Sequence, residues 1–178
     1  GAGAGSFTIN KAPTATAVTC NAGPFAYIGA AITPCAATVT GAGGLNEAVD
    51  VLYLNNVNAG TASASYAFAG DANYTGSTGS ASFSIARAPS TTAVTCEPGV
   101  PYNGAAQTPC TAQATGVGMS PVNVSASLVY AGNTNAGAAS ATATYGGDAN
   151  HSGSTGVGGE GVGGDGVGGD RHLHRLAV

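Results

Sequence analysis

The chain has few charged residues: Asp, Glu, Lys and Arg make up 7% of its 178 residues, and tryptophan is absent. An ordinary globular domain carries about 25% charged residues, so ordinary surface composition is excluded. Only four Lys and Arg stand against eight Asp and Glu, which gives a net charge of -4. Such a chain has no basic surface to neutralise a phosphate backbone, so we expect no nucleic acid partner.

Long apolar runs are also missing. No stretch approaches the roughly 20 apolar residues that a membrane-spanning helix requires, so no membrane insertion is expected. The opening residues GAGAGS lack the basic and apolar regions of a signal peptide and do not start with methionine. We therefore expect the sequence to be a piece of a longer protein.

The residues that are abundant are glycine, at 30 positions, and the small residues Ala, Ser and Thr. Within residues 61–68 every second residue is apolar, which is the period of a strand with one buried face. The same reasoning predicts strands at 15–19, 35–40, 49–54, 61–68 and 80–85. In the second half, residues 122–130 alternate so regularly that one continuous strand is predicted there.

The sequence repeats itself. Residues 16–20, TAVTC, return at 92–96, and other matched pairs lie 75 to 77 residues apart. This spacing indicates tandem duplication, with each copy one folding unit. We assign residues 1–9 to the end of a preceding repeat, 10–86 to a first repeat and 87–156 to a second.

Residues 156–170 read as Gly-Val-Gly-Gly followed by an acidic residue, three times over. Glycine has too much backbone entropy and too little side chain to favour an interior strand. We therefore predict that 157–178 is a disordered, flexible, Gly-rich tail and that the second repeat lacks its closing strand. The short strands and frequent turns of both repeats predict an all-β fold of two tandem antiparallel β-sandwich domains.

The cysteines come in one pair per repeat, Cys20 with Cys35 and Cys96 with Cys110. A disulfide across such a loop contributes about 3 kcal/mol in the chain-entropy model, a large share for a domain with a thin alanine core. A four-cysteine zinc site needs closely spaced pairs that this chain lacks. Free buried thiols are the other alternative. Disulfides would indicate an oxidising compartment, so the protein would be secreted, periplasmic or at the cell surface, and we expect an extracellular or cell-surface location.

A glycine-aspartate-asparagine turn also recurs, as Gly70, Asp71 and Asn73 and as Gly147, Asp148 and Asn150. These residue types tolerate left-handed backbone and bond their own main chain, so we predict that they cap turns. A calcium site is the alternative, but one carboxylate in each repeat is a poor match for a cation that needs six or more oxygens.

We find no residues for catalysis. The histidines are His151, His172 and His174, and no Cys/His or Ser/His/acid set occurs in both repeats. We therefore predict no enzyme activity, no cofactor and no specific metal site. Tyrosines recur at matched positions, where either core packing or a carbohydrate-binding strip is conceivable, and we favour the core. They are Tyr27, Tyr53, Tyr102 and Tyr130.

Residues 69–74, AGDANY, followed by FSI at 83–85 and a basic-Ala-Pro junction at 87–89, resemble bacterial immunoglobulin-like repeat domains. Tyr-x-Gly at 27–29 and Asn-Ala-Gly at 58–60 resemble the related MBG-type repeats of adhesin-like proteins. The chain departs from the pattern in its paired cysteines and in His151, where the first repeat has Tyr74.

The resemblance implies immunoglobulin-like domains in a spacer or stalk of an extracellular or cell-surface bacterial protein. Its partners would be the neighbouring repeats of the same chain, and it would carry out no catalysis. The alternative is an adhesion module that binds a glycan or a protein through its sheet edges or loops.

Overall fold

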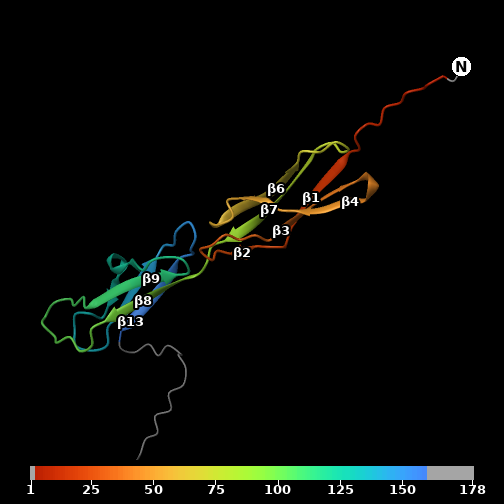
Figure 1. Cartoon of the computed structure of the whole chain (residues 1–178). Coiled ribbons are helices and arrows are strands. Elements are labelled where there is room, and N and C mark those ends of the chain that lie inside the picture. Colours follow the sequence, from red (N-terminus) through yellow and green to blue (C-terminus); the bar gives the residue numbers. More distant parts are fainter. Residues whose placement is uncertain (1–2, 160–178) are drawn as a thin grey trace, which may run out of the picture.

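The computed structural model describes residues 3–159, which form an all-β structure of mainly antiparallel sheets. Figure 1 shows two units placed end to end, with β1 to β7 in the first and β8 to β13 in the second. The elements of the first unit are β1 (Thr14–Cys20), β2 (Phe25–Ala26), β3 (Cys35–Gly41), the short 3-10 helix η1 (Ala42–Gly44), β4 (Leu45–Val49), β5 (Leu52–Leu54), β6 (Gly60–Phe68) and β7 (Ser77–Ala86). Those of the second are β8 (Ser90–Cys96), β9 (Cys110–Gly116), β10 (Val122–Asn123), η2 (Ser125–Ser127), β11 (Val129–Ala131), β12 (Ser140–Tyr145) and β13 (Ser154–Gly159).

Each unit contains two sheets. In the first unit their strand orders are β1-β3-β4 and β2-β7-β6-β5, and in the second they are β10-β9-β8 and β11-β12-β13. All neighbouring strands in these sheets are antiparallel apart from β2 and β7, which run parallel. The duplicated sequence therefore produces a duplicated arrangement of strands.

The core of the first unit follows from the alternation in β3, β6 and β7. Val39 on β3, Ala62 and Ala64 on β6, and Phe83 and Ile85 on β7 are all buried, with polar or small residues between them. The strands predicted at 61–68 and 80–85 are confirmed as parts of β6 and β7. Among the described residues of both units, most buried hydrophobic side chains are alanines, which remove little apolar area from water, so the cores are thin.

Each unit also holds its own first residues against its turn. The backbone N–H of Ala12 donates to the carbonyl of Asn73 at 2.8 Å. The N–H of Ala88 donates to the carbonyl of Asn150, also at 2.8 Å. The two basic-Ala-Pro segments thus occupy equivalent places, and the chain enters both units in the same way.

The second unit has a closing strand up to Gly159, so the prediction that it lacks one is wrong for the described residues. Residues 154–159 form β13, which pairs with β12 from Tyr145↔Ser154 to Ser140↔Gly159. Glycine is suited to this strand because a Cβ at Gly156 would collide with the carbonyl of Thr92 on β8. The predicted flexible tail is therefore wrong for 157–159, and its remainder, 160–178, lies outside the described residues.

The strand predicted at 49–54 is in fact two strands in different sheets. β4 ends at Val49 and pairs with β3, whereas β5 begins at Leu52 and pairs with β6. Alternation continues across the crossing from one sheet to the other, so the pattern alone did not reveal the break.

The continuous strand predicted at 122–130 is also wrong. The hydroxyl of Ser125 accepts a hydrogen bond from the backbone N–H of Ala112 at 2.9 Å, and the hydroxyl of Ser127 donates to the carbonyl of Val124 at 2.7 Å. Serine side chains that bond nearby backbone compete with the strand ladder. The segment therefore forms β10, the 3-10 turn η2 and β11.

Candidate functional site at the junction of the two units

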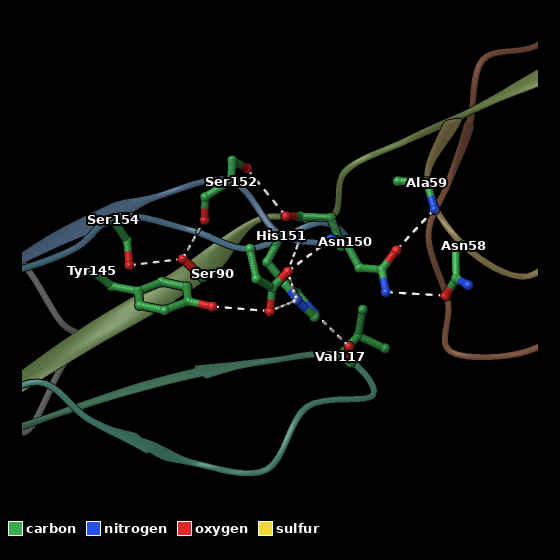
Figure 2. Close-up of polar contacts among 11 residues, drawn as sticks. Asn58, Ala59, Ser90, Val117, Tyr145, Asn150, His151, Ser152 and Ser154 are labelled. Atoms are coloured by element: carbon green, nitrogen blue, oxygen red, sulfur yellow. Dashed lines mark hydrogen bonds and ion pairs between the residues drawn. The ribbon is translucent and has the colours of Figure 1, made fainter. Parts of the chain in front are cut away.

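The two units meet through four short segments, which we call the junction. The first unit contributes residues 27–29 and 58–59, and the second contributes 117–118 and the turn 147–151. Figure 2 shows Asn150 reaching Asn58 and Ala59 of the first unit, while His151 points toward Val117 within the second. Two polar residues are buried in the part of the chain that the structure describes, and one of them, His151, lies in the junction.

The turn at 147–151 is formed by local hydrogen bonds. One carboxylate oxygen of Asp148 accepts from the backbone N–H groups of Asn150 and His151, both at 2.7 Å. Gly147 has a φ of +86°, and a Cβ there would lie 2.7 Å from the carbonyl oxygen of His151. Only glycine fits this position without strain.

The first unit has the same turn. Asp71 accepts from the N–H groups of Asn73 and Tyr74 at 2.7 and 2.8 Å, and Gly70 has a φ of +80°. The six residues predicted to cap turns therefore lie in two turns of one geometry. Their carboxylates are engaged with backbone N–H groups, which leaves little capacity for a hard cation.

His151 is the most enclosed polar residue of the junction, with 2% of its surface exposed. Its Nδ1 lies 2.9 and 3.0 Å from the two carboxylate oxygens of Asp148, and its Nε2 lies 2.8 Å from the carbonyl oxygen of Val117. Both neighbours are acceptors, whereas a neutral imidazole has only one N–H. The geometry therefore fits the protonated imidazolium, which donates to both.

The hydrogen bond to Val117 raises the pKa of His151, with burial opposing and Asp148 reinforcing this shift. For Asp148, burial opposes ionisation, but hydrogen bonds from Asn150, His151 and Tyr145 together lower its pKa to about 2. Tyr145 donates its hydroxyl to the same carboxylate at 3.0 Å, and its own pKa is raised by burial and by Asp148. The network thus pairs the imidazolium of His151 with the carboxylate of Asp148 within the turn.

The first unit packs directly on this network. The ring of Tyr27 stands edge-on to the imidazole of His151, with centroids 5.3 Å apart and planes at 85°. The amide of Asn150 accepts from the backbone N–H of Ala59 at 2.9 Å and donates to the side chain of Asn58 at 3.1 Å. Aromatic and hydrogen-bonding contacts therefore fix the second unit against the first.

Two glycines let the backbones approach beside these contacts. A Cβ at Gly118 would lie 3.1 Å from the Cα of Gly29, which belongs to the other unit. Both glycines have positive φ, +68° and +74°. The sequence placed Gly29 in a repeated Tyr-x-Gly pattern but gave no sign that it faces Gly118.

The cysteines form two disulfides, Cys20–Cys35 and Cys96–Cys110. In each pair the cysteines are also partners in the strand register, at the ends of β1 and β3 and of β8 and β9. The part of the chain that the structure describes holds no free cysteine. The two disulfides indicate an oxidising environment.

The matched tyrosines do different things. The hydroxyl of Tyr53 donates to the carbonyl of Cys35 at 2.9 Å, and that of Tyr130 donates to the carbonyl of Cys110 at 3.3 Å, as the core interpretation predicts. Tyr27 is buried in the junction, but its counterpart Tyr102 is 66% exposed. The core prediction is therefore wrong for Tyr102.

Sequence reasoning missed the residues that complete the junction. Tyr27 and Asn58 stood in patterns that recur as Tyr102 and Asn135, but recurrence did not show that they face another unit. Val117 acts through its carbonyl, which no side-chain pattern reveals.

Within residues 3–159 no three His, Cys, Asp or Glu side chains gather into a group that could hold a metal ion. The helices among the described residues are too short to span a membrane. His172 and His174 lie outside the described residues. Comparison with known proteins found no matching family model, no matching curated protein and no matching solved structure.

Proposed function

We propose that this chain is a spacer: two tandem immunoglobulin-like β-sandwich domains that hold other parts of an extracellular bacterial protein at a set distance. The observation that carries the proposal is the junction. A linker that merely connects two domains would leave them free, whereas here Tyr27, Asn58 and Gly29 of the first unit contact residues of the second. These are His151, Asn150 and Gly118, respectively.

The repeated strand order and the equivalent entry of the chain into both units support the assignment to tandem immunoglobulin-like domains. The end-to-end placement in Figure 1 supports a role in spanning distance. The disulfides support an extracellular or cell-surface location, because a domain with a thin core gains most from a covalent link in an oxidising medium.

A rigid spacer tumbles as one body, and this is the basis of its test. We expect 15N relaxation to give both units of the wild-type chain one common rotational diffusion tensor. Tyr27→Ala removes the ring that packs on His151, so the two units of this variant are expected to tumble separately.

Tyr102→Ala is the matched control. It removes the same side chain at the equivalent position of the second unit, where Tyr102 is 66% exposed and lies outside the junction. Separate tumbling of the two units in the wild-type chain would contradict the spacer proposal.

A second candidate, adhesion through a sheet edge, is favoured by one observation. β5 is an edge strand, and its Leu52 and Leu54 are 76% and 64% exposed. Exposed apolar residues on an open edge are suited to pairing with another strand. Saturable binding on a glycan array or in a protein pulldown, lost in Leu52→Asp with Leu54→Asp, would support adhesion.

A further inference from the structure

The turn at 147–151 differs from its counterpart in the first unit at the residue that bonds the neighbouring loop. In the first unit this residue is Tyr74, whose hydroxyl donates to the carbonyl of Ala42 at 2.6 Å. In the second unit His151 stands at the equivalent position and faces Val117, the counterpart of Ala42. A titratable ring therefore replaces a phenol in one of two equivalent contacts.

The second unit also adds a donor to this turn. Tyr145 stands where the first unit has Phe68, and its hydroxyl donates to the carboxylate of Asp148 at 3.0 Å. In the first unit the carboxylate of Asp71 accepts from backbone N–H groups. Two replacements thus change a turn capped by backbone bonds into a network of a histidine, an aspartate and a tyrosine.

The loop that follows β9 lies between this network and the first unit. The carbonyl oxygen of Val117 is 2.8 Å from Nε2 of His151 (Figure 2). A Cβ on the next residue, Gly118, would lie 3.1 Å from the Cα of Gly29 and 3.3 Å from the hydroxyl oxygen of Tyr27. The residue that bonds the histidine and the residue that contacts the first unit are therefore neighbours, so movement of one displaces the other.

Loss of one proton leaves this network short of a donor. A neutral imidazole has one N–H, yet acceptors lie at both of its nitrogens: Asp148 at 2.9 and 3.0 Å and the carbonyl of Val117 at 2.8 Å. His151 is buried, and a buried acceptor without a donor is unfavourable. A hydrogen bond to an ionised acceptor is stronger than one to a neutral acceptor. The remaining proton therefore stays on Nδ1, and the carbonyl of Val117 loses its donor.

Among the groups around the ring, the histidine is the one whose ordinary range lies near neutral pH. Asp148 and Tyr145 face it from the second unit, and Tyr27 faces it from the first. The segment that enters β8 brings Arg87, which stays charged, next to the residue that forms a β-bridge with the histidine. Burial opposes ionisation of Asp148, but its hydrogen bonds lower its pKa to about 2, and burial raises the pKa of Tyr145.

We propose that the junction is pH-sensitive: it holds the two units as one body while His151 carries both ring protons and loosens when the ring becomes neutral. This inference rests on the proposed spacer function and adds a condition to it. In the neutral state Val117 moves away from the turn, and Gly118 loses its contact with the first unit. The hydrogen bonds of Asn150 to the first unit involve no titrating group, so the units stay in contact but move more freely.

NMR of the 178-residue chain tests this inference with two readouts. The ring carbon shifts of His151 give the pH at which its proton is lost. Relaxation of the methyl groups of the buried alanines, which both units contain, shows whether the units tumble together. We expect one common rotational diffusion tensor while the ring is charged and two different tensors once it is neutral. Both readouts should share one midpoint above pH 6.5, because the hydrogen bond to Val117 raises the pKa of His151.

Asp148→Asn separates a titrating role from a purely structural one. It removes the anion but keeps an oxygen for the two backbone N–H groups of the turn. Both midpoints should move together to lower pH, because the imidazolium loses its negative partner. Asp71→Asn is the matched control, since it makes the same change in the turn that carries Tyr74, and it should leave both midpoints in place. In His151→Tyr the tumbling should no longer depend on pH.

Four results would overturn the inference. One is common tumbling at every pH between about 5 and 9 although the ring loses its proton, which would leave the spacer proposal intact. A second is a ring that keeps its proton up to about pH 9. A third is a tumbling midpoint that stays fixed in Asp148→Asn while the ring midpoint moves. The fourth is separate tumbling while the ring is still charged, and this result alone would also contradict the spacer proposal.

Discussion

Gly156→Ala tests whether the glycine-rich segment 154–159 is a packed strand. Gly156 on β13 lies against Thr92 on β8, which belongs to the other sheet of the second unit. A Cβ on Gly156 would collide with the carbonyl oxygen of Thr92 and lie 2.8 Å from its carbonyl carbon. Because both obstacles are backbone atoms, β8 and β13 must move apart, and such overpacking costs about 1–3 kcal/mol.

Native-state hydrogen exchange measures the effect in each unit separately. The opening free energy of the β12 and β13 amides should fall by about 1–3 kcal/mol in Gly156→Ala, while that of the β6 and β7 amides stays unchanged. Gly79→Ala should do the reverse, because a Cβ there would lie 2.5 Å from the carbonyl oxygen of Thr16 on β1.

Gly146→Ala is the control. A Cβ at Gly146 has nothing within 4 Å and its φ is not positive, so alanine should be neutral or stabilise by up to about 1 kcal/mol. If Gly156→Ala proves as harmless as Gly146→Ala, β13 does not pack against β8 and the reasoning is refuted.

Three further predictions concern the disulfide, the histidine and the junction. Cys20→Ala with Cys35→Ala should lower the unfolding free energy of the first unit by about 3 kcal/mol, as measured by hydrogen exchange, because a link across 15 residues is lost; a loss below about 1 kcal/mol would contradict the chain-entropy account. The pKa of His151 is raised, so its stabilising charge is complete below the unfolded value of 6.5 and is lost as pH rises through the higher folded value. The melting temperature of the wild type should therefore fall as pH rises across that range, whereas that of His151→Tyr should not change with pH. The tyrosine hydroxyl of this variant can still donate to the carbonyl of Val117, as Tyr74 donates to that of Ala42. Equal dependence of melting temperature on pH in both proteins would argue against an imidazolium at position 151. Asn150→Ala removes both hydrogen bonds of this side chain to the first unit, so the two units should tumble more independently in 15N relaxation. Relaxation identical to that of the wild type would contradict this prediction.

The parts of the fold that sequence could predict are those that depend on local chemistry or on recurrence. Cys20 and Cys35 flank a loop, and Cys96 and Cys110 flank the equivalent loop of the second repeat. This duplication indicated that each disulfide forms between the two cysteines of one repeat. The period-two pattern of residues 61–68 stays on one face because the whole of β6 lies in one sheet.

The closing strand could not be predicted because its glycines were judged by propensity. Glycine is a weak strand former, but Gly156 is placed where any side chain would strike the neighbouring sheet. The absence of a side chain at Gly156 is thus a packing requirement. Packing between two sheets cannot be read from the alternation of apolar and polar residues along one strand.

The junction escaped prediction for a related reason. His151 read as a departure from Tyr74 at a turn, and its two acceptors become visible only when β9 brings Val117 beside the turn. Tyr102 shows the converse: it matches Tyr27 in sequence but is exposed, because burial of this tyrosine depends on a neighbouring unit.

The central claim is that the chain is a spacer of two domains, each closed by its own disulfide, and it is tested most directly by pulling the chain from its two ends. We predict two separate unfolding events. Addition of reductant should lengthen each event by about 50 Å, because 15 and 14 residues, at about 3.5 Å each, lie inside the two covalent loops. Extension without distinct unfolding events, or events whose length is indifferent to reductant, would contradict the claim.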